Sequence, residues 1–129
     1  MPAAALLDVL IVDDQASTRH LIRSCLTQLG ISRIRECEDG EAARELLRTA
    51  RVHVIFSDIN MPKLDGLGLL SAVRASPAIA STAFIMLTSR ADTALVQEAV
   101  KLGVNNYIVK PFSLEVLKKK LEAVVGKLT

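Results

Sequence analysis

Five polar residues lie just after short apolar runs of this sequence, within two positions of each run's end, and their types suit phosphate chemistry. Asp13 and Asp14 follow the first run, Asp58 the third, Thr88 the fourth and Lys110 the fifth. Carboxylates are ligands for a hard divalent cation such as Mg²⁺, and a carboxylate can also act as a nucleophile. A hydroxyl and an ammonium beside them could bind a phosphoryl group and stabilise its charge. The five residues are therefore candidates for a metal-dependent site of phosphoryl transfer.

The apolar runs are rich in Val and Ile, and stretches with helical periodicity separate them. This alternation is typical of a parallel sheet with helices on both faces. We predict strands at Val9–Val12, Ile34–Cys37, Val52–Phe56, Ala83–Leu87 and Tyr107–Val109. The fold class predicted is α/β, an open doubly wound sheet of five parallel strands, because a closed barrel would need about twice the length.

The predicted topology brings the polar residues together. Carboxyl ends of parallel strands meet at one edge of a sheet, and binding sites form there, where the strand order reverses. Three carboxylates at this edge would repel one another by about 4 kcal/mol per pair at an effective dielectric constant near 20. Mg²⁺ and the ammonium of Lys110 could offset that repulsion. Asp58 is the better nucleophile, because it stands alone, whereas Asp13 and Asp14 are adjacent and suit metal binding.

Helices are expected between the strands and after the last one. Asp39 and Asp92 are good N-cap residues for the second and fourth helices, Gly66 marks the start of the third, and Ser113 caps the fifth. Gly30 is a suitable left-handed stop for the first helix. The apolar faces of the first and fifth helices are formed by Leu21, Ile22, Cys25, Leu26 and Leu29, and by Leu114, Leu117, Leu121, Val124 and Val125.

Composition limits the class of protein. The 129 residues are 50% hydrophobic and 23% charged, which fits one globular domain over residues 1–129. With 16 basic and 14 acidic residues, the charge balance indicates neither a nucleic-acid nor a membrane partner. Cys25 and Cys37 suggest neither a zinc site nor a disulfide framework. Because no long apolar segment or signal peptide is evident, we expect a cytoplasmic location. We also expect a monomer.

The sequence resembles the receiver family of response regulators, from Leu10 to Val125. The segments that carry the resemblance are Leu10–Asp14, Ser57–Pro62, Asp65–Gly66, Leu87–Ser89 and Lys110–Phe112. It implies a flavodoxin-like (βα)5 fold with strand order 2-1-3-4-5, as in single-domain regulators of the CheY type in two-component signalling. The resemblance also implies a cis peptide bond between Lys110 and Pro111.

The resemblance implies a role for each matching residue. Asp58 would accept a phosphoryl group from a histidine kinase or a phosphotransfer protein. Asp13, Asp14, Asp58 and the backbone carbonyl of Asn60 would hold Mg²⁺. The side chains of Thr88 and Lys110 would contact the phosphoryl oxygens.

Tyr107 matches the aromatic residue of the family's conformational switch, which works together with Thr88. The output would be a changed face, made by the fourth helix, the fifth strand and the fifth helix, that binds a downstream effector protein in a pathway such as chemotaxis or motility. The protein would be a switch rather than an enzyme, catalysing only its own phosphorylation and dephosphorylation.

Three other functions fit parts of the pattern. Phosphatases of the haloacid dehalogenase type also use an Asp after a strand with Mg²⁺, but they need a second Asp where this chain has Asn60. A flavin-binding protein could share the fold, although the loop after the first strand opens with Asp13 and Asp14 rather than hydroxyl-rich residues. A degenerate receiver that only binds proteins is the third alternative.

Overall fold

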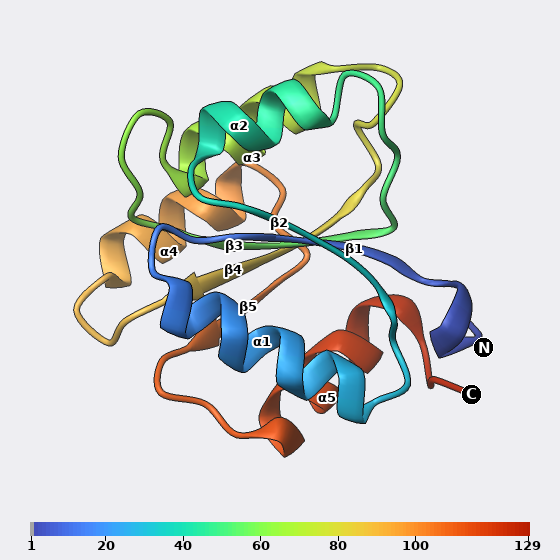
Figure 1. Cartoon of the computed structure of the whole chain (residues 1–129). Coiled ribbons are helices and arrows are strands. Elements are labelled where there is room, and N and C mark those ends of the chain that lie inside the picture. The colour runs from blue at the N-terminus through green and yellow to red at the C-terminus, as the bar shows by residue number, and fades with distance from the viewer. Residues whose placement is uncertain (1) are drawn as a thin grey trace.

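The computed structural model describes residues 2–129 and places five parallel strands in one sheet, with helices on both faces (Figure 1). The strand order is β2-β1-β3-β4-β5, which confirms the predicted topology. The elements are a short 3₁₀ helix η1 (Ala4–Leu6), β1 (Asp8–Val12), α1 (Ala16–Gln28), β2 (Arg33–Cys37), α2 (Gly40–Leu46), β3 (Val54–Asp58), α3 (Gly66–Ala75), β4 (Ala83–Thr88), α4 (Thr93–Lys101), β5 (Asn106–Val109) and α5 (Leu114–Val125).

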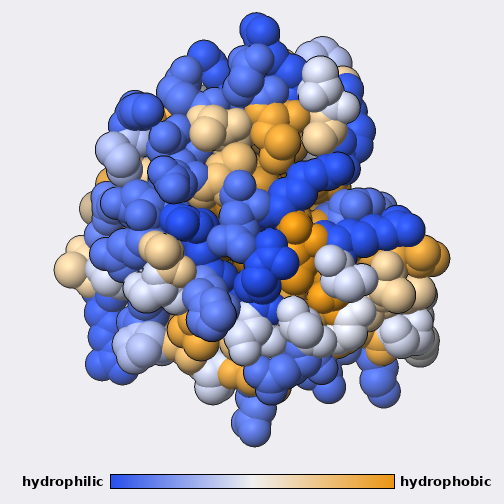
Figure 2. All heavy atoms as spheres, in the orientation of Figure 1, coloured by the Kyte–Doolittle hydropathy of each residue, from blue (hydrophilic) through white to orange (hydrophobic). Residues whose placement is uncertain are grey.

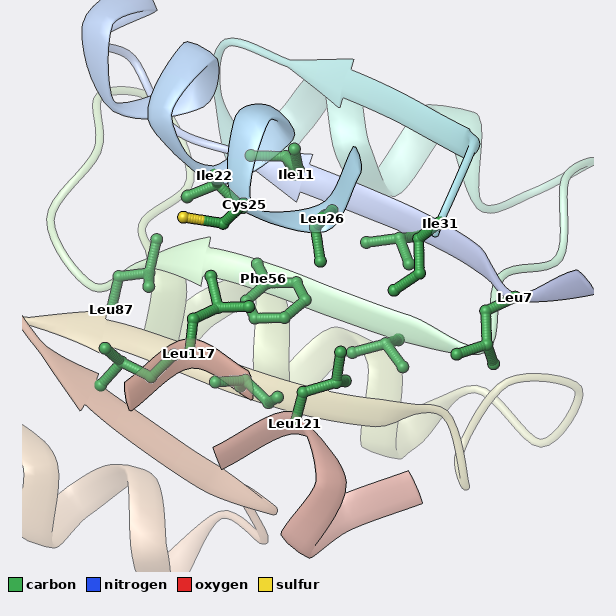
Figure 3. Close-up of a cluster of buried hydrophobic side chains, with 14 of the residues drawn as sticks. Leu7, Ile11, Ile22, Cys25, Leu26, Ile31, Phe56, Leu87, Leu117 and Leu121 are labelled. Atoms are coloured by element: carbon green, nitrogen blue, oxygen red, sulfur yellow. The ribbon is translucent and has the colours of Figure 1, made fainter. Parts of the chain in front are cut away.

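The sheet separates two apolar layers. Helices α1 and α5 cover one face of the sheet, and α2, α3 and α4 cover the other (Figure 1). Phe56 of β3 is fully buried in the first layer, where Leu26 of α1 and Leu117 and Leu121 of α5 surround it (Figure 3). Strands β1, β3 and β4 are buried on both faces, which explains why they read as continuous apolar runs rather than as an alternating pattern.

The strand register aligns the carboxyl ends of the central strands. Val12 pairs with Ser57, and Asp58 pairs with Leu87, so that the residues ending β1, β3 and β4 lie at nearly the same level. Asp58 and Thr88 are the last residues of their strands, whereas the sequence pattern put them just after the strands. The predicted start of β3 at Val52 is wrong by two residues, because Val52 lies outside the sheet and packs against the α2–α3–α4 layer.

Several predicted helix boundaries are confirmed by capping geometry. Asp39 accepts a hydrogen bond from the Ala42 amide at 2.8 Å, and Ser113 accepts one from Val116 at 3.2 Å. These bonds satisfy amides that have no partner within the first turn. Gly30 follows α1 with a φ of 88°, a backbone conformation that favours glycine.

Two predicted helix positions behave differently from expectation. Leu21 was assigned to the apolar face of α1 but is 45% exposed, because it lies about 100° around the helix from the buried Ile22. Asp92 occupies the N-cap position of α4, yet its side chain makes no capping hydrogen bond to the helix.

No helix within residues 2–129 combines the length and hydropathy needed to span a bilayer.

Candidate functional site

The carboxylates at the carboxyl edge of the sheet form a compact acidic cluster. Asp13 and Asp14 directly follow β1, and Asp58 ends β3, so that each offers an oxygen within 4.8 Å of the others. Asp13 is fully buried, Asp58 is partly buried and Asp14 is exposed. The cluster therefore opens to solvent on the Asp14 side, where a ligand could enter.

Lys110 supplies the fixed positive charge of the cluster. It follows β5, and the peptide bond between Lys110 and Pro111 is cis, as expected. Its ammonium Nζ lies 3.2 Å from Asp13 Oδ2 and 3.4 Å from Asp58 Oδ1. One ammonium cannot balance three carboxylates, so the site favours a further cation.

Hard oxygen donors of this kind fit Mg²⁺. Mg²⁺ is usually held by one or two carboxylates together with water and phosphate oxygens, and the exposed side of the cluster leaves room for both. Asp13, Asp14 and Asp58 could all contribute, whereas Zn²⁺ would favour nitrogen or sulfur ligands. Cys25 and Cys37 are free thiols on other parts of the chain and do not belong to the cluster.

Burial raises the pKa of the Asp58 carboxyl above its usual value, and the charge of Asp13 raises it further. The Lys110 ammonium and the backbone amide of Asn60 oppose this shift, because both stabilise the ionised form. A divalent cation at the cluster would act in the same direction as Lys110. Added positive charge near Asp58 would therefore favour the ionised form of its carboxyl group.

Arg19, which was not predicted as a site residue, anchors the backbone of Asp13. Arg19 of α1 donates a hydrogen bond of 2.7 Å to the backbone carbonyl of Asp13. Glu36 of β2 holds Arg19 in place at 3.1 Å and also pairs with Arg23 at 2.6 Å. The Asp13 side chain is further oriented by the Gln15 amide, which donates to Oδ1 at 2.9 Å.

Thr88 is buried at the end of β4, next to the cluster in the sheet. Its hydroxyl oxygen lies 3.1 Å from the Ser89 carbonyl oxygen and 3.3 Å from Asp92 Oδ2. Among the described residues, no hydrogen bond joins this hydroxyl to Asp58. Asp92 therefore belongs to the surroundings of the site, a role that its interpretation as a helix cap missed.

Tyr107 lies on β5 but outside the acidic cluster. It is 37% exposed, and the ammonium of Lys120 on α5 lies 4.8 Å from the centroid of its ring. An ammonium over the face of an aromatic ring is attracted by the ring quadrupole. The structure thus places the ring at the surface between β5 and α5, in contact with solvent.

Gly66 lies against the backbone that carries Asp58. A Cβ atom at this position would collide with the Asp58 carbonyl oxygen and lie 2.8 Å from Ile59 Cα. Backbone atoms cannot yield as a flexible side chain can. Only glycine lets α3 begin this close to the end of β3.

We expect Gly66→Ala to lower the free energy of unfolding by about 2 kcal/mol or more, because overpacking against backbone forces the Asp58 segment to move. Urea denaturation followed by circular dichroism measures this change. Gly68→Ala is the matched control, since its Cβ would meet the movable side chain of Leu64 and alanine favours the helix. Equal unfolding free energies for the two variants would contradict the proposed crowding.

A cavity of about 510 Å³ lies elsewhere, between α2, α3 and the loop after α3. Six of its ten lining residues are apolar and three are arginines, and none of the acidic-cluster residues takes part. Figure 2 shows apolar groups among polar ones over this α2 and α3 layer. This cavity is therefore separate from the acidic cluster.

Comparisons with known proteins agree with these features. Residues 9–122 match the family model described as the response regulator receiver domain. A probable chemotaxis protein CheY of Rhizobium etli is 47% identical over 99% of both chains. Chemotaxis protein CheY1 of Helicobacter pylori strain J99 is 44% identical over 92% of this chain and 96% of its own.

Solved structures share the fold. Chemotaxis protein CheY4 of Vibrio cholerae aligns with a TM-score of 0.85 at 35% identity, covering 93% of this chain and 99% of its own. The receiver domain of a Pseudomonas aeruginosa sensor histidine kinase aligns with a TM-score of 0.84 at 26% identity, over 94% of this chain and 98% of its own. That structure is described with a magnesium ion coordinated in its active site cleft.

Proposed function

This chain belongs to the response regulator receiver family, and from that premise we propose that it is a phosphorylation-activated switch of two-component signalling in chemotaxis. Asp58 accepts a phosphoryl group from a histidine kinase or a phosphotransfer protein. One receiver domain accounts for residues 1–129. The phosphorylated form then binds an effector protein differently from the unphosphorylated form.

One observation carries this proposal: the Asp58 carboxylate lies 3.4 Å from the Lys110 ammonium and within 4.8 Å of the Asp13 and Asp14 carboxylates. This arrangement offers a nucleophile, a fixed cation and oxygen ligands for a metal on one open side. Phosphoryl transfer needs mainly positioning and neutralisation of charge, and both are provided here.

The chemistry assigns a part to each residue. A carboxylate oxygen of Asp58 forms a bond to phosphorus, and the bond between phosphorus and the donor's leaving atom breaks with its electron pair staying on the leaving group. Mg²⁺, when bound, neutralises the phosphoryl oxygens. Lys110 contacts a phosphoryl oxygen, and the Thr88 hydroxyl donates to another. The backbone carbonyl of Asn60 would complete the protein ligands of the metal with Asp13, Asp14 and Asp58.

We further propose that the output surface is the face of α4, β5 and α5. Each of these elements carries an exposed apolar residue, namely Val100, Tyr107 and Val116. Exposed apolar groups on neighbouring elements favour protein binding. When Thr88 turns towards the phosphoryl group, the Tyr107 ring moves inward into the space that the threonine leaves, and this face changes shape.

The alternatives fit less well. A phosphatase of the haloacid dehalogenase type would need an acid or base at the position of Asn60, and an amide cannot fill that role. A purely protein-binding receiver would have no use for three converging carboxylates with a lysine between two of them. Their mutual repulsion is the kind of unfavourable interaction that persists where a function needs it.

The direct test is phosphorylation in vitro. With Mg²⁺ and acetyl phosphate, the intact mass of the wild-type protein should rise by one phosphoryl group, and Asp58→Asn should abolish this rise because an amide is not a competent nucleophile. Peptide mapping should place the group on Asp58. Asp8→Asn, which removes a carboxylate at the far end of β1, should leave uptake unchanged. Phosphate on a residue other than Asp58 in the wild-type protein would refute the assignment.

A further inference from the structure

The loop between β4 and α4 is held by one carboxylate. Asp92 Oδ2 accepts hydrogen bonds from the Ser89 amide at 3.0 Å and the Ser89 hydroxyl at 2.9 Å, and it lies 3.3 Å from the Thr88 hydroxyl oxygen. The side-chain amide of Asn60, from the loop after β3, lies 3.4 Å from the other oxygen, Oδ1. Asp92 therefore links the two loops that flank the acidic cluster.

Because of this arrangement, the Asp92 side chain does not cap α4, the helix that it precedes. An aspartate at an N-cap position normally accepts from an amide of the first helical turn, as Asp39 does for α2. Asp92 makes no such bond, and its carboxylate turns back towards Thr88 and Ser89 instead. The local contacts with Ser89 would suffice for a loop turn, but those with Thr88 and Asn60 reach residues of the proposed phosphorylation site.

We propose that Asp92 is a positioning residue that holds Thr88 and Asn60 in the unphosphorylated arrangement and so opposes the binding of the phosphoryl group. This inference rests on the proposed function. A threonine hydroxyl has a single proton, so Thr88 cannot donate to Asp92 and to a phosphoryl oxygen at the same time. The phosphorylated state therefore requires the hydroxyl to leave both acceptors that it meets here, Asp92 Oδ2 at 3.3 Å and the Ser89 carbonyl oxygen at 3.1 Å.

Asp92 thereby affects how readily the phosphorylated arrangement forms. Breaking a hydrogen bond to a charged acceptor opposes activation until new bonds replace it. The Asp92 charge also lies close to residues that would bind an anion, and removing it favours an incoming phosphoryl group. Both effects act in the same direction, towards easier activation when Asp92 is replaced.

The test uses beryllofluoride with Mg²⁺ as a phosphoryl mimic, titrated into the whole protein and followed by fluorine NMR. Asp92→Ala should lower the half-saturating beryllofluoride concentration by about threefold or more, the equivalent of a single hydrogen bond. Asp92→Asn should give an intermediate value, because its amide oxygen still accepts from Thr88 and Ser89 without the charge. Glu98→Ala, which removes an exposed carboxylate from α4, should match the wild-type protein.

A second measurement separates positioning from simple loop support. In the metal-free protein, Asp92→Ala should shift the Ser89 amide and Thr88 methyl resonances, because the bonds to the carboxylate are lost. If these resonances move while wild-type and Asp92→Ala bind beryllofluoride equally, Asp92 only supports the loop and the inference is overturned. A wild-type protein that binds no beryllofluoride would overturn the proposed function itself, and with it any opposing role for Asp92.

Discussion

Removal of divalent cations should slow the phosphorylation of Asp58 by acetyl phosphate by at least about a hundredfold, since metal neutralisation contributes several kcal/mol to such reactions. The reason lies in the charge of the cluster. Asp13, Asp14 and Asp58 come within 4.8 Å of one another, and Lys110 provides one positive charge against three negative ones. An anionic phosphodonor would meet net negative charge there unless a cation were bound.

This effect is measured as the rate of mass increase in EDTA and after Mg²⁺ is restored. Asp14→Asn should raise the Mg²⁺ concentration needed for half the maximal rate by about fivefold or more, because it removes one ligand from a site with few protein ligands. Asp8→Asn serves as the control, since Asp8 begins β1, at the end opposite to Asp14, which follows that strand. A rate in EDTA that equals the rate in Mg²⁺ would rule out a metal-dependent site.

The sequence predicted the features that depend on periodicity and on strand ends. Apolar runs such as Ile55 and Phe56 of β3 predicted the strands, and the alternation with helices predicted an open parallel sheet. The strand order was predicted from the resemblance to receiver domains. Parallel strands then had to bring Asp13, Asp58 and Lys110 to one edge, which the structure confirms. The carboxyl ends of β3 and β4 were predicted two residues and one residue too early, because each strand continues into the polar residues that follow its last apolar side chain.

Contacts that depend on side-chain direction were beyond the sequence. Asp92 occupies the place of a helix cap, and only the loop conformation decides that its carboxylate turns towards Ser89 and Thr88. Arg19 could have been any solvated arginine of α1, because its contact with the Asp13 carbonyl depends on how the helix docks on the sheet. The exposure of Leu21 likewise follows from the rotation of α1, which a broad apolar stripe leaves uncertain.

Lys110 offers a way to separate phosphate uptake from its conformational effect. Its ammonium contacts both Asp13 and Asp58, and it follows the strand that carries Tyr107. A compact ammonium can contact a single phosphoryl oxygen, whereas the planar guanidinium of arginine is larger and binds as a fork. Charge alone should therefore support uptake, and the shape of the lysine should be needed to draw the loops into the activated arrangement.

We expect Lys110→Met to slow phosphorylation by about a hundredfold, the usual effect of removing one group that stabilises charge in the transition state, and Lys110→Arg to restore much of the rate. Neither variant should show the conformational response.

Tyr107 is the only tyrosine and the chain has no tryptophan, so intrinsic fluorescence reports its exposure. In the wild-type protein, beryllofluoride with Mg²⁺ should reduce acrylamide quenching as the ring moves inward. Lys118→Met, on the exposed side of α5, should behave like wild type, and a wild-type response in beryllofluoride-saturated Lys110→Arg would show that the ammonium is not needed for coupling.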